Sequence, residues 1–239
     1  MDDGHVALLA PVAVERLPLY RWRPGTRLLA VGSRDGASFA GDPEAAERNT
    51  FRRPFDAALL TSLRTKLDCA GYAVMWSDPL RHPRGLATVL EAAGEAPVVV
   101  CTPGRGAVTA ELLARVDAWV LLADAQPGPA VAEILAGGRH VEVLAGLDGR
   151  PLPALEWARA AAMHLVARRP AEADQLDGWC AAVRGAWTTP VPLHDHHHQH
   201  SDCACGERLV WRHNGRSRLD GLVDGRCQRC GATAPGVWR

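Results

Sequence analysis

The sequence lacks a charge excess of either sign and is almost without lysine. Its 239 residues include 27 basic and 27 acidic side chains, and Lys66 is the only lysine. A protein whose whole surface holds nucleic acid needs a basic excess, so the balance argues against that class. A local basic patch remains compatible with the even charge balance.

Long apolar segments are also missing. The first residues, MDDGHVALLAPV, are acidic and contain only a short apolar run, so they do not resemble a cleavable leader. No stretch of 18 apolar residues follows. We therefore expect a soluble cytoplasmic protein that does not contact membranes and whose thiols stay reduced.

The common nucleotide-binding and hydrolase motifs are absent. The sequence contains no P-loop, no G-x-G-x-x-G fingerprint and no G-x-S-x-G elbow. Glycine-rich turns at 32–36 and 102–106 could in principle hold an anion, but ordinary turns are the simpler interpretation.

Short apolar runs alternate with helix-like segments along most of the chain. The runs cover 27–31, 72–76, 97–102, 118–123 and 141–145, and a weaker one covers 190–194. The helix-like segments cover 54–68, 83–94, 106–115, 128–137, 151–168 and 171–185, with Pro54 and Pro83 near helix starts and Gly137-Gly138 as a stop. This alternation predicts an α/β fold around a parallel sheet that is covered on both faces.

Six β/α units fit before residue 195. A complete eight-stranded barrel needs about 250 residues, so we expect a partial TIM-like (β/α)6 barrel, or alternatively a doubly wound sheet. Periodicity does not choose between the two.

The carboxyl ends of these strands are where an α/β domain holds a ligand. The long loop at 32–54 follows the first strand there. The candidate cleft residues are Ser33, Asp35, Ser77, Asp78, Thr102 and His194, together with Asp124 and Glu142 as further strand-end groups. A carboxylate within reach of a histidine could support acid–base chemistry.

The seven cysteines divide into three scattered ones and four in the last 37 residues. The scattered ones are Cys69, Cys101 and Cys180, and we expect them to be buried structural thiols. The other four are Cys203, Cys205, Cys227 and Cys230. Two thiol-bearing turns bridged by a hairpin around Asn214-Gly215 are typical of a zinc ribbon with four thiolate ligands to Zn²⁺.

The first cysteine pair has an irregular spacing, C-x-C in place of C-x-x-C. Asp202 or His200 could therefore replace Cys203 as a ligand. A module of this size is too small to be stable on apolar burial alone, so the ion would supply folding free energy.

A histidine-rich run precedes the ribbon, with His194, His196, His197, His198 and His200. We interpret it as a polar linker over 195–202 with weak affinity for divalent metals. The alternative is that His194 ends the last strand and faces the cleft.

Several segments together resemble the radical SAM proteins of the AmmeMemoRadiSam system, relatives of pyruvate formate-lyase activating enzyme. They are LPLYRWRPGTRLLAVG at 17–32, MWSDP at 75–79, DAWVLLAD at 117–124, HVEV at 140–143, TPVPLH at 189–194 and the knuckle from Gly225 to Trp238. The similarity runs in order along nearly the whole chain. It implies a lead-in at 1–26, a radical-SAM-like partial barrel at 27–194 and a ribbon module at 203–239.

One departure from the family removes its chemistry. Family members hold a [4Fe–4S] cluster through C-x-x-x-C-x-x-C in the loop after the first strand. The corresponding loop at 32–49 contains no cysteine, and the ligand positions fall near Gly36, Ala40 and Pro43. We therefore expect neither the cluster nor reductive cleavage of S-adenosylmethionine.

The first hypothesis is thus a cluster-less homologue, a pseudoenzyme that acts as a metal-binding scaffold or as the partner of another protein. The second is an enzyme with changed chemistry in the retained cleft, with a small-molecule ligand that could still be S-adenosylmethionine. The third is a zinc-ribbon nucleic-acid binder. It is motivated by arginines interleaved with Trp211, but Asp220, Asp224 and the neutral chain argue against it.

Overall fold

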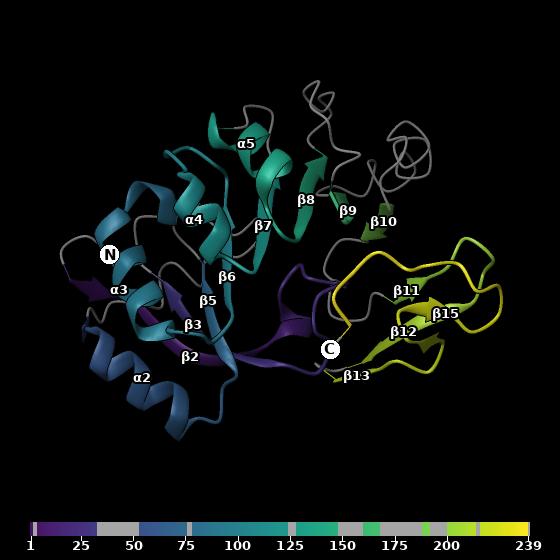
Figure 1. Ribbon diagram of the computed structural model, residues 1–239, viewed down its shortest axis with the longest axis horizontal. Coiled ribbons are helices and arrows are strands. Elements are labelled where there is room, and N and C mark those ends of the chain that lie inside the picture. Colours follow the sequence, from purple (N-terminus) through teal and green to yellow (C-terminus); the bar gives the residue numbers. More distant parts are fainter. Residues whose placement is uncertain are drawn as a thin grey trace.

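A mixed eight-stranded sheet forms the centre of the protein (Figure 1). The computed structural model describes residues 1, 4–32, 53–75, 78–123, 128–147, 160–167, 188–191, 200–213 and 216–238. The strand order in this sheet is β10-β9-β8-β7-β6-β5-β3-β2. The strands are β2 (Leu8–Ala13), β3 (Arg27–Gly32), β5 (Gly71–Val74), β6 (Val98–Thr102), β7 (Ala118–Ala123), β8 (Val141–Leu147), β9 (Ala162–Ala167) and β10 (Thr188–Val191).

The sheet is parallel except at β2, which pairs antiparallel with β3. Each parallel strand lies beside its predecessor in the sequence, with no reversal of order. The five strong apolar runs form β3, β5, β6, β7 and β8, so the prediction of a mostly parallel α/β sheet is confirmed. Their near-continuous apolar character fits a sheet that is covered on both faces.

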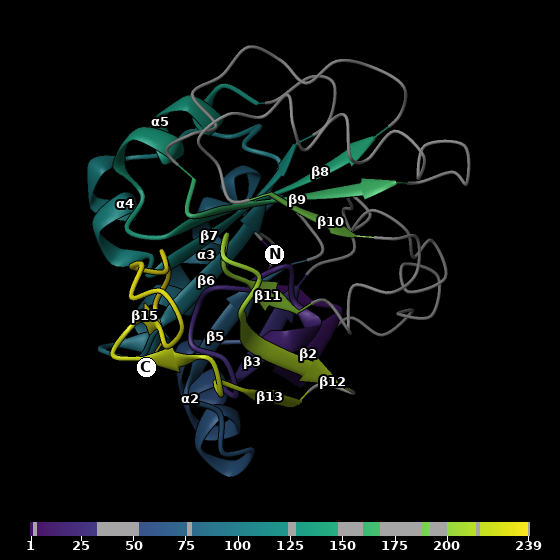
Figure 2. The ribbon, with the colours of Figure 1, turned by 90° about the vertical axis from the view of Figure 1, so that its right-hand side faces the viewer.

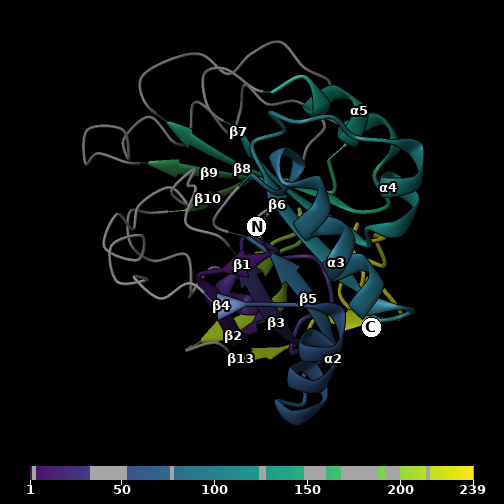
Figure 3. The same cartoon turned by 90° about the vertical axis from the view of Figure 1, so that its left-hand side faces the viewer.

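Helices cover one face of the sheet, which we call the outer face (Figure 3). They are α2 (Ala57–Lys66), α3 (Pro83–Ala93), α4 (Ala110–Arg115) and α5 (Ala130–Gly137). Asp56 caps α2 by accepting a hydrogen bond from the Leu59 backbone at 2.7 Å, and Pro83 stands in the first turn of α3. Their apolar side chains share a core with the odd-numbered residues of β7 and β8, such as Trp119, Leu121 and Val143.

Two local predictions were wrong in this half of the chain. Pro54 does not open a helix, because β4 (Arg53–Pro54) pairs with β1 (His5–Val6), and α2 begins at Ala57. Part of the helix predicted at 151–168 is the strand β9. Its run Ala162–Ala167 (AMHLVA) is rich in helix formers and has no alternation, so composition could not distinguish a buried strand from a helix. The remainder at 151–159 and the helix predicted at 171–185 lie outside the described residues.

The opposite, inner face of the sheet is covered by the start of the chain. After β2, a short 3-10 helix, η1 (Val14–Arg16), leads into residues 17–22, which cross that face. Leu17, Leu19 and Trp22 pack there against Ala30, Cys101 and Val120. The predicted lead-in at 1–26 therefore contributes a strand to the sheet and a cover to its inner face.

A second, smaller sheet system lies on the inner side of the molecule (Figure 2). It consists of β11 (Ser201–Asp202), β12 (Arg208–His213), β13 (Arg216–Arg218), β14 (Leu222–Val223) and β15 (Arg226–Cys227). β11, β12 and β13 form an antiparallel sheet, and β14 pairs with β15. The two strands predicted on either side of 214–215 are β12 and β13. From here on, the name ribbon means residues 200–238, which include the end of the predicted linker and most of the predicted module at 203–239. The domain boundaries expected at 26, 194 and 202 stay predictions.

No helix in the described part of the chain has both the length and the apolar character needed to cross a membrane.

Candidate metal centre

Four cysteine sulfurs converge at one end of the ribbon. Cys203, Cys205, Cys227 and Cys230 have their sulfurs within 4.8 Å of one another. The Cys203 and Cys230 sulfurs are 3.6 Å apart, as are those of Cys205 and Cys227. A tetrahedral ion with metal–sulfur bonds of about 2.3 Å needs sulfurs about 3.8 Å apart, so this group fits an ion such as Zn²⁺.

Two tight turns bring the cysteines into this arrangement. In the first, Gly206 has φ 84° and donates its N–H to the Cys203 carbonyl at 2.8 Å. In the second, Gly231 has φ 73° and donates to the Cys227 carbonyl at 2.9 Å. Glycine is favoured at both positions because other residues rarely adopt a positive φ. The two turns therefore explain why each cysteine pair is followed by glycine.

Backbone amides point at the sulfurs inside each turn. The N–H of Cys230 donates to the Cys227 sulfur and lowers the pKa of that thiol to about 7. At Cys205 the N–H of Glu207 also lowers the pKa of the thiol. Desolvation and the three neighbouring sulfurs together outweigh this bond and raise the pKa of Cys205 to about 12. Four thiolates this close repel one another strongly unless a cation lies between them, so the turns are suited to a metal-bound state.

The C-x-C spacing does not displace Cys203 from the group of sulfurs. Asp202 accepts a hydrogen bond from Arg208 Nε at 3.0 Å instead of joining the cluster. His200 uses Nδ1 to accept from the Arg212 backbone at 3.1 Å, and its ring lies tilted against Trp211 with 4.5 Å between the ring centres. Neither proposed replacement ligand belongs to the described metal-binding group.

At the carboxyl edge of the sheet, the structure brings together two of the predicted cleft residues. Thr102 ends β6, and its hydroxyl donates to Asp78 Oδ1 at 2.6 Å. Asp78 also accepts from the backbone of Leu80 at 3.3 Å and of Arg105 at 3.0 Å. The Gly104 backbone in turn donates to Thr102 Oγ1 at 2.9 Å. Both side chains are buried, and the bonds tie the loop after β5 to the loop after β6.

The other predicted cleft residues are not brought to this pair by the described part of the chain. Ser33, Asp35, Ser77, His194 and Asp124 lie outside the described residues. Glu142 was expected among the strand-end groups, and that expectation was wrong. It is the second residue of β8 and lies level with Val120 and Cys101, so its side chain is on the inner face, whereas Thr102 is level with Leu121 on the opposite face.

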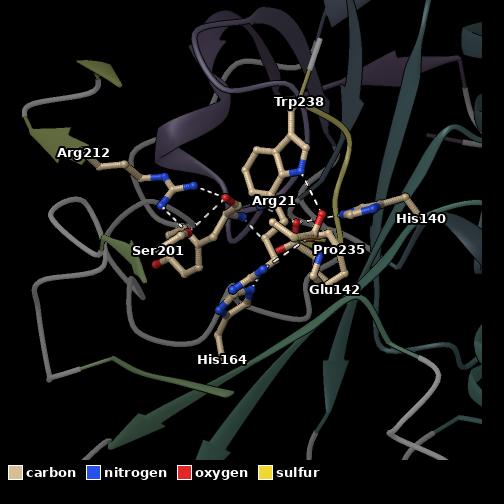
Figure 4. A network of polar contacts seen from close by, with 10 residues as sticks. Arg21, His140, Glu142, His164, Ser201, Arg212, Pro235 and Trp238 are labelled. Atoms are coloured by element: carbon tan, nitrogen blue, oxygen red, sulfur yellow. Dashed lines mark hydrogen bonds and ion pairs between the residues drawn. The ribbon is translucent and has the colours of Figure 1, made fainter. Parts of the chain in front are cut away.

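Glu142 is instead the centre of a buried polar cluster on the inner face (Figure 4). Its carboxylate accepts hydrogen bonds from the backbones of Tyr20 and Arg21, each at 2.8 Å. It also accepts from His140 Nε2 at 2.9 Å and from His164 Nε2 at 2.6 Å. The segment that crosses the inner face is thus tied to β8 and β9 by one carboxylate.

The cluster is strongly charged although it is buried. Burial alone would raise the pKa of Glu142, but the hydrogen bonds from His140 and His164 hold it well below its usual range. Burial lowers the pKa of His164, against the attraction of Glu142. Burial also lowers the pKa of Arg21 to about 10, again opposed by Glu142. Glu142 is therefore ionised, and its charge is balanced by arginines at the same face.

Arg212 belongs to the ribbon but reaches into this cluster (Figure 4). It is only 1% exposed, and its guanidinium donates to the Tyr20 carbonyl oxygen and, at 2.9 Å, to Ser201 Oγ. It also lies 5.0 Å from the centre of the Tyr20 ring. This role of Arg212 was not predicted from the sequence, although its place two residues after Val210 and between Trp211 and His213 along β12 was a signal for an inward position.

The two other described cysteines do not approach each other. Cys69 packs in the core beneath the helices, whereas Cys101 packs on the inner face. Burial raises the pKa of Cys101 to about 12, so this thiol stays protonated at neutral pH. Both agree with the expectation of buried structural cysteines, and Cys180 lies outside the described residues.

The fold and this centre define a class: an α/β protein with a mostly parallel sheet and four clustered cysteines that could bind a metal ion. No family model, curated protein or solved structure matches the chain.

Proposed function

We propose that this protein is a cluster-less homologue of the radical SAM proteins that holds Zn²⁺ in its ribbon and acts as a scaffold or as the binding partner of another protein. The observation that carries the proposal is the set of four sulfurs within 4.8 Å of one another. Four thiolates fill a tetrahedral shell and leave no open position for a substrate, which is the arrangement of structural zinc.

The topology of the sheet supports the barrel-like part of this proposal. The parallel strands follow one another in sequence order, whereas a doubly wound sheet reverses its order at a switch point. The described helices lie on the outer face alone (Figure 3). A partial (β/α) barrel combines these two properties.

The distribution of thiols supports the loss of radical chemistry. The loop at 32–49 has no cysteine, and Cys69 and Cys101 pack on opposite faces of the sheet. Since a cluster needs three thiolates around one centre, the cysteines that the structure describes outside the ribbon do not supply them.

The alternative of an enzyme with changed chemistry has less support. It rests on Asp78 and Thr102 at the carboxyl edge, and their hydrogen bonds go to each other and to loop backbones. This pattern is typical of a loop brace. S-adenosylmethionine nevertheless remains the ligand to test at that edge.

A nucleic-acid interface is favoured by one observation on the ribbon. Trp211 is 41% exposed, and the guanidinium carbons of Arg208 and Arg218 lie 5.0 Å and 5.9 Å from its ring centre. An aromatic ring between two arginines is suited to stacking with bases. Asp202 and Asp220, however, pair with the same two arginines and reduce their charge.

Metal analysis tests the main proposal. Purified wild type is expected to contain about one zinc ion per chain, Cys227→Ser to lose both zinc and solubility, and Cys69→Ser to keep both. An unchanged zinc content in Cys227→Ser would refute the ribbon site. Stoichiometric [4Fe–4S] after anaerobic reconstitution would refute the cluster-less assignment.

Two binding measurements decide between the alternatives. Saturable micromolar binding of S-adenosylmethionine by calorimetry would support the changed enzyme. Salt-dependent binding of single-stranded DNA that is lost in Trp211→Ala would support the nucleic-acid interface.

A further inference from the structure

The ribbon is attached to the inner face at two separate places. The first attachment is Arg212 of β12, whose guanidinium donates to the Tyr20 carbonyl. Burial lowers the pKa of Arg212 and Glu142 opposes this, so the nearby carboxylate favours the charged guanidinium where it is. An isolated buried cation is costly, and so this arginine is held by the cluster around Glu142.

The second attachment joins the end of the ribbon to residues 21–23. Trp22 and Val237 form a parallel bridge in which Arg23 N donates to Val237 O at 2.5 Å and Val237 N donates to Arg21 O at 2.6 Å. The Arg21 side chain adds a bond to the Pro235 carbonyl at 3.3 Å. Gly236 fits closely between them, because a Cβ there would lie 2.6 Å from the Arg21 carbonyl oxygen.

Both attachments depend on a ribbon with a very small core of its own. The buried members of that core are Cys203, Leu209, Val210, Cys227 and Ala234. Two of these five are members of the sulfur group, so the ribbon has few apolar contacts apart from its metal site. A ribbon of this kind gains much of its folding free energy from a bound ion, and the folded ribbon is what positions Arg212 and Val237.

We propose that the ribbon is a metal-dependent cap on the inner face of the sheet: the loaded ribbon closes over residues 20–23 through Arg212 and Val237, and loss of the metal opens it. The inference rests on the proposed zinc site and adds a conformational role to it. Tyr20 and Arg21 stay tied to Glu142 and Trp22 stays packed on the sheet, so opening uncovers residues 20–23 without dissolving the sheet beneath them.

Thermodynamic linkage makes the proposal measurable from both directions. If bound metal favours the closed cap by some factor, then closure favours metal binding by the same factor, so a variant that weakens the closed cap should also weaken metal binding. Arg212→Met keeps the four sulfurs and removes the first attachment. Its affinity for Zn²⁺, measured by competition with a chromogenic chelator, is expected to fall about tenfold, within the usual range of such couplings.

Matched variants control for a general loss of stability. Arg216→Met changes an exposed arginine of the neighbouring strand β13 and is expected to keep the wild-type affinity. Gly236→Ala removes the second attachment without touching Arg212, and it too is expected to weaken Zn²⁺ binding. Gly94→Ala is its control, because Gly94 also has a positive φ of 54° but has no atom within 4 Å of an added Cβ. If Arg212→Met does not fold, Gly236→Ala decides the question.

Residue-resolved hydrogen exchange gives the second readout. On removal of zinc from the wild type with a chelator, the amide of Arg23 should lose protection, since its acceptor is Val237 of the ribbon. The amides of Tyr20 and Arg21 should stay protected, since their acceptor is Glu142. Unchanged protection of Arg23 would overturn the cap.

The outcomes separate this inference from the proposed function. A wild type without zinc overturns both. A wild type with zinc whose affinity is unchanged in Arg212→Met and Gly236→Ala overturns the cap alone.

Discussion

His164 Nε2 lies 2.6 Å from Glu142 Oε2, and both side chains are fully removed from solvent. The histidine donates to an ionised carboxylate, and its Nδ1 has no hydrogen-bond partner among the described residues. Together with His140 and two backbone amides, this contact gives Glu142 four donors. The Glu142 carboxylate therefore links its own strand, β8, to residues 20–21 and to β9.

Glu142→Gln should destabilise the protein substantially. The amide keeps one acceptor oxygen, so some of the four donors lose their partner and the nearby arginines lose their counter-charge. Disrupting such a buried charge network costs about 3–5 kcal/mol of unfolding free energy. Urea unfolding measures it, with Glu91→Gln on the exposed side of α3 as the matched control. A loss no larger than that of the control would contradict the central role of Glu142.

The same cluster predicts a stability that declines in acid. The pKa of Glu142 is lowered on folding, so its contribution to stability is fully present above its unfolded pKa of 4.5 and is lost progressively as the pH falls from there towards the folded pKa. The pKa of His164 is also lowered, so the unfolded chain takes up a proton below about pH 6.5 that the folded chain resists. Both effects lower the free energy of unfolding as the pH falls.

Comparing wild type with Glu142→Gln at each pH isolates the contribution of Glu142 to the unfolding free energy. Acid also releases metal from the thiolates, but this loss affects both proteins and cancels in the comparison. The difference in their unfolding free energies should be largest near neutral pH and shrink as the pH falls below about 4.5. A difference that is independent of pH would mean that Glu142 is not ionised in the folded protein.

Asp202→Asn should leave the metal content unchanged. Asp202 pairs with Arg208 at the surface, and an exposed pair of this kind contributes about 0–1 kcal/mol. Cys203→Ser, one position away, should lose the metal because its sulfur belongs to the cluster. Zinc analysis of both variants tests whether C-x-C supplies two thiolates. The reverse pattern would place a carboxylate in the site.

Thr102→Val should weaken the brace between the loops after β5 and β6. The variant keeps the shape of the side chain but leaves Asp78 Oδ1 without its hydroxyl donor and Gly104 N without its acceptor. Such unsatisfied buried groups cost about 1–3 kcal/mol. Thr65→Val, at an exposed position of α2, should stay within about 0.5 kcal/mol of wild type. Equal denaturation midpoints for the two variants would contradict the brace.

The sequence predicted the parts of this protein that depend on local patterns. The apolar runs of β3, β5, β6, β7 and β8 identify strands because a strand covered on both faces must be apolar throughout. The paired cysteines and their following glycines identify the turns of the ribbon, since a positive φ and a thiol are both local requirements.

The parts that depend on tertiary contacts were missed. β9 has the composition of a helix and is a strand because β8 and β10 provide its hydrogen-bond partners. Glu142 was expected at the carboxyl edge and Arg212 only among the arginines around Trp211, because their shared position at the inner face depends on two distant segments. The Asp78–Thr102 contact was within reach of prediction, because Thr102 ends β6 and Asp78 follows the adjacent parallel strand β5, but its use of backbone donors was not.

The bond between Arg21 and the Pro235 carbonyl joins positions 214 residues apart. During synthesis, residues 17–22 leave the ribosome long before the ribbon that completes their surroundings. The inner face must therefore remain unfinished for most of translation, and contacts of such long range are slow to form. The side of residues 21–23 that faces the ribbon thus stays uncovered in the nascent chain until residues 235–237 are made, although Leu19 and Trp22 can already pack against the sheet.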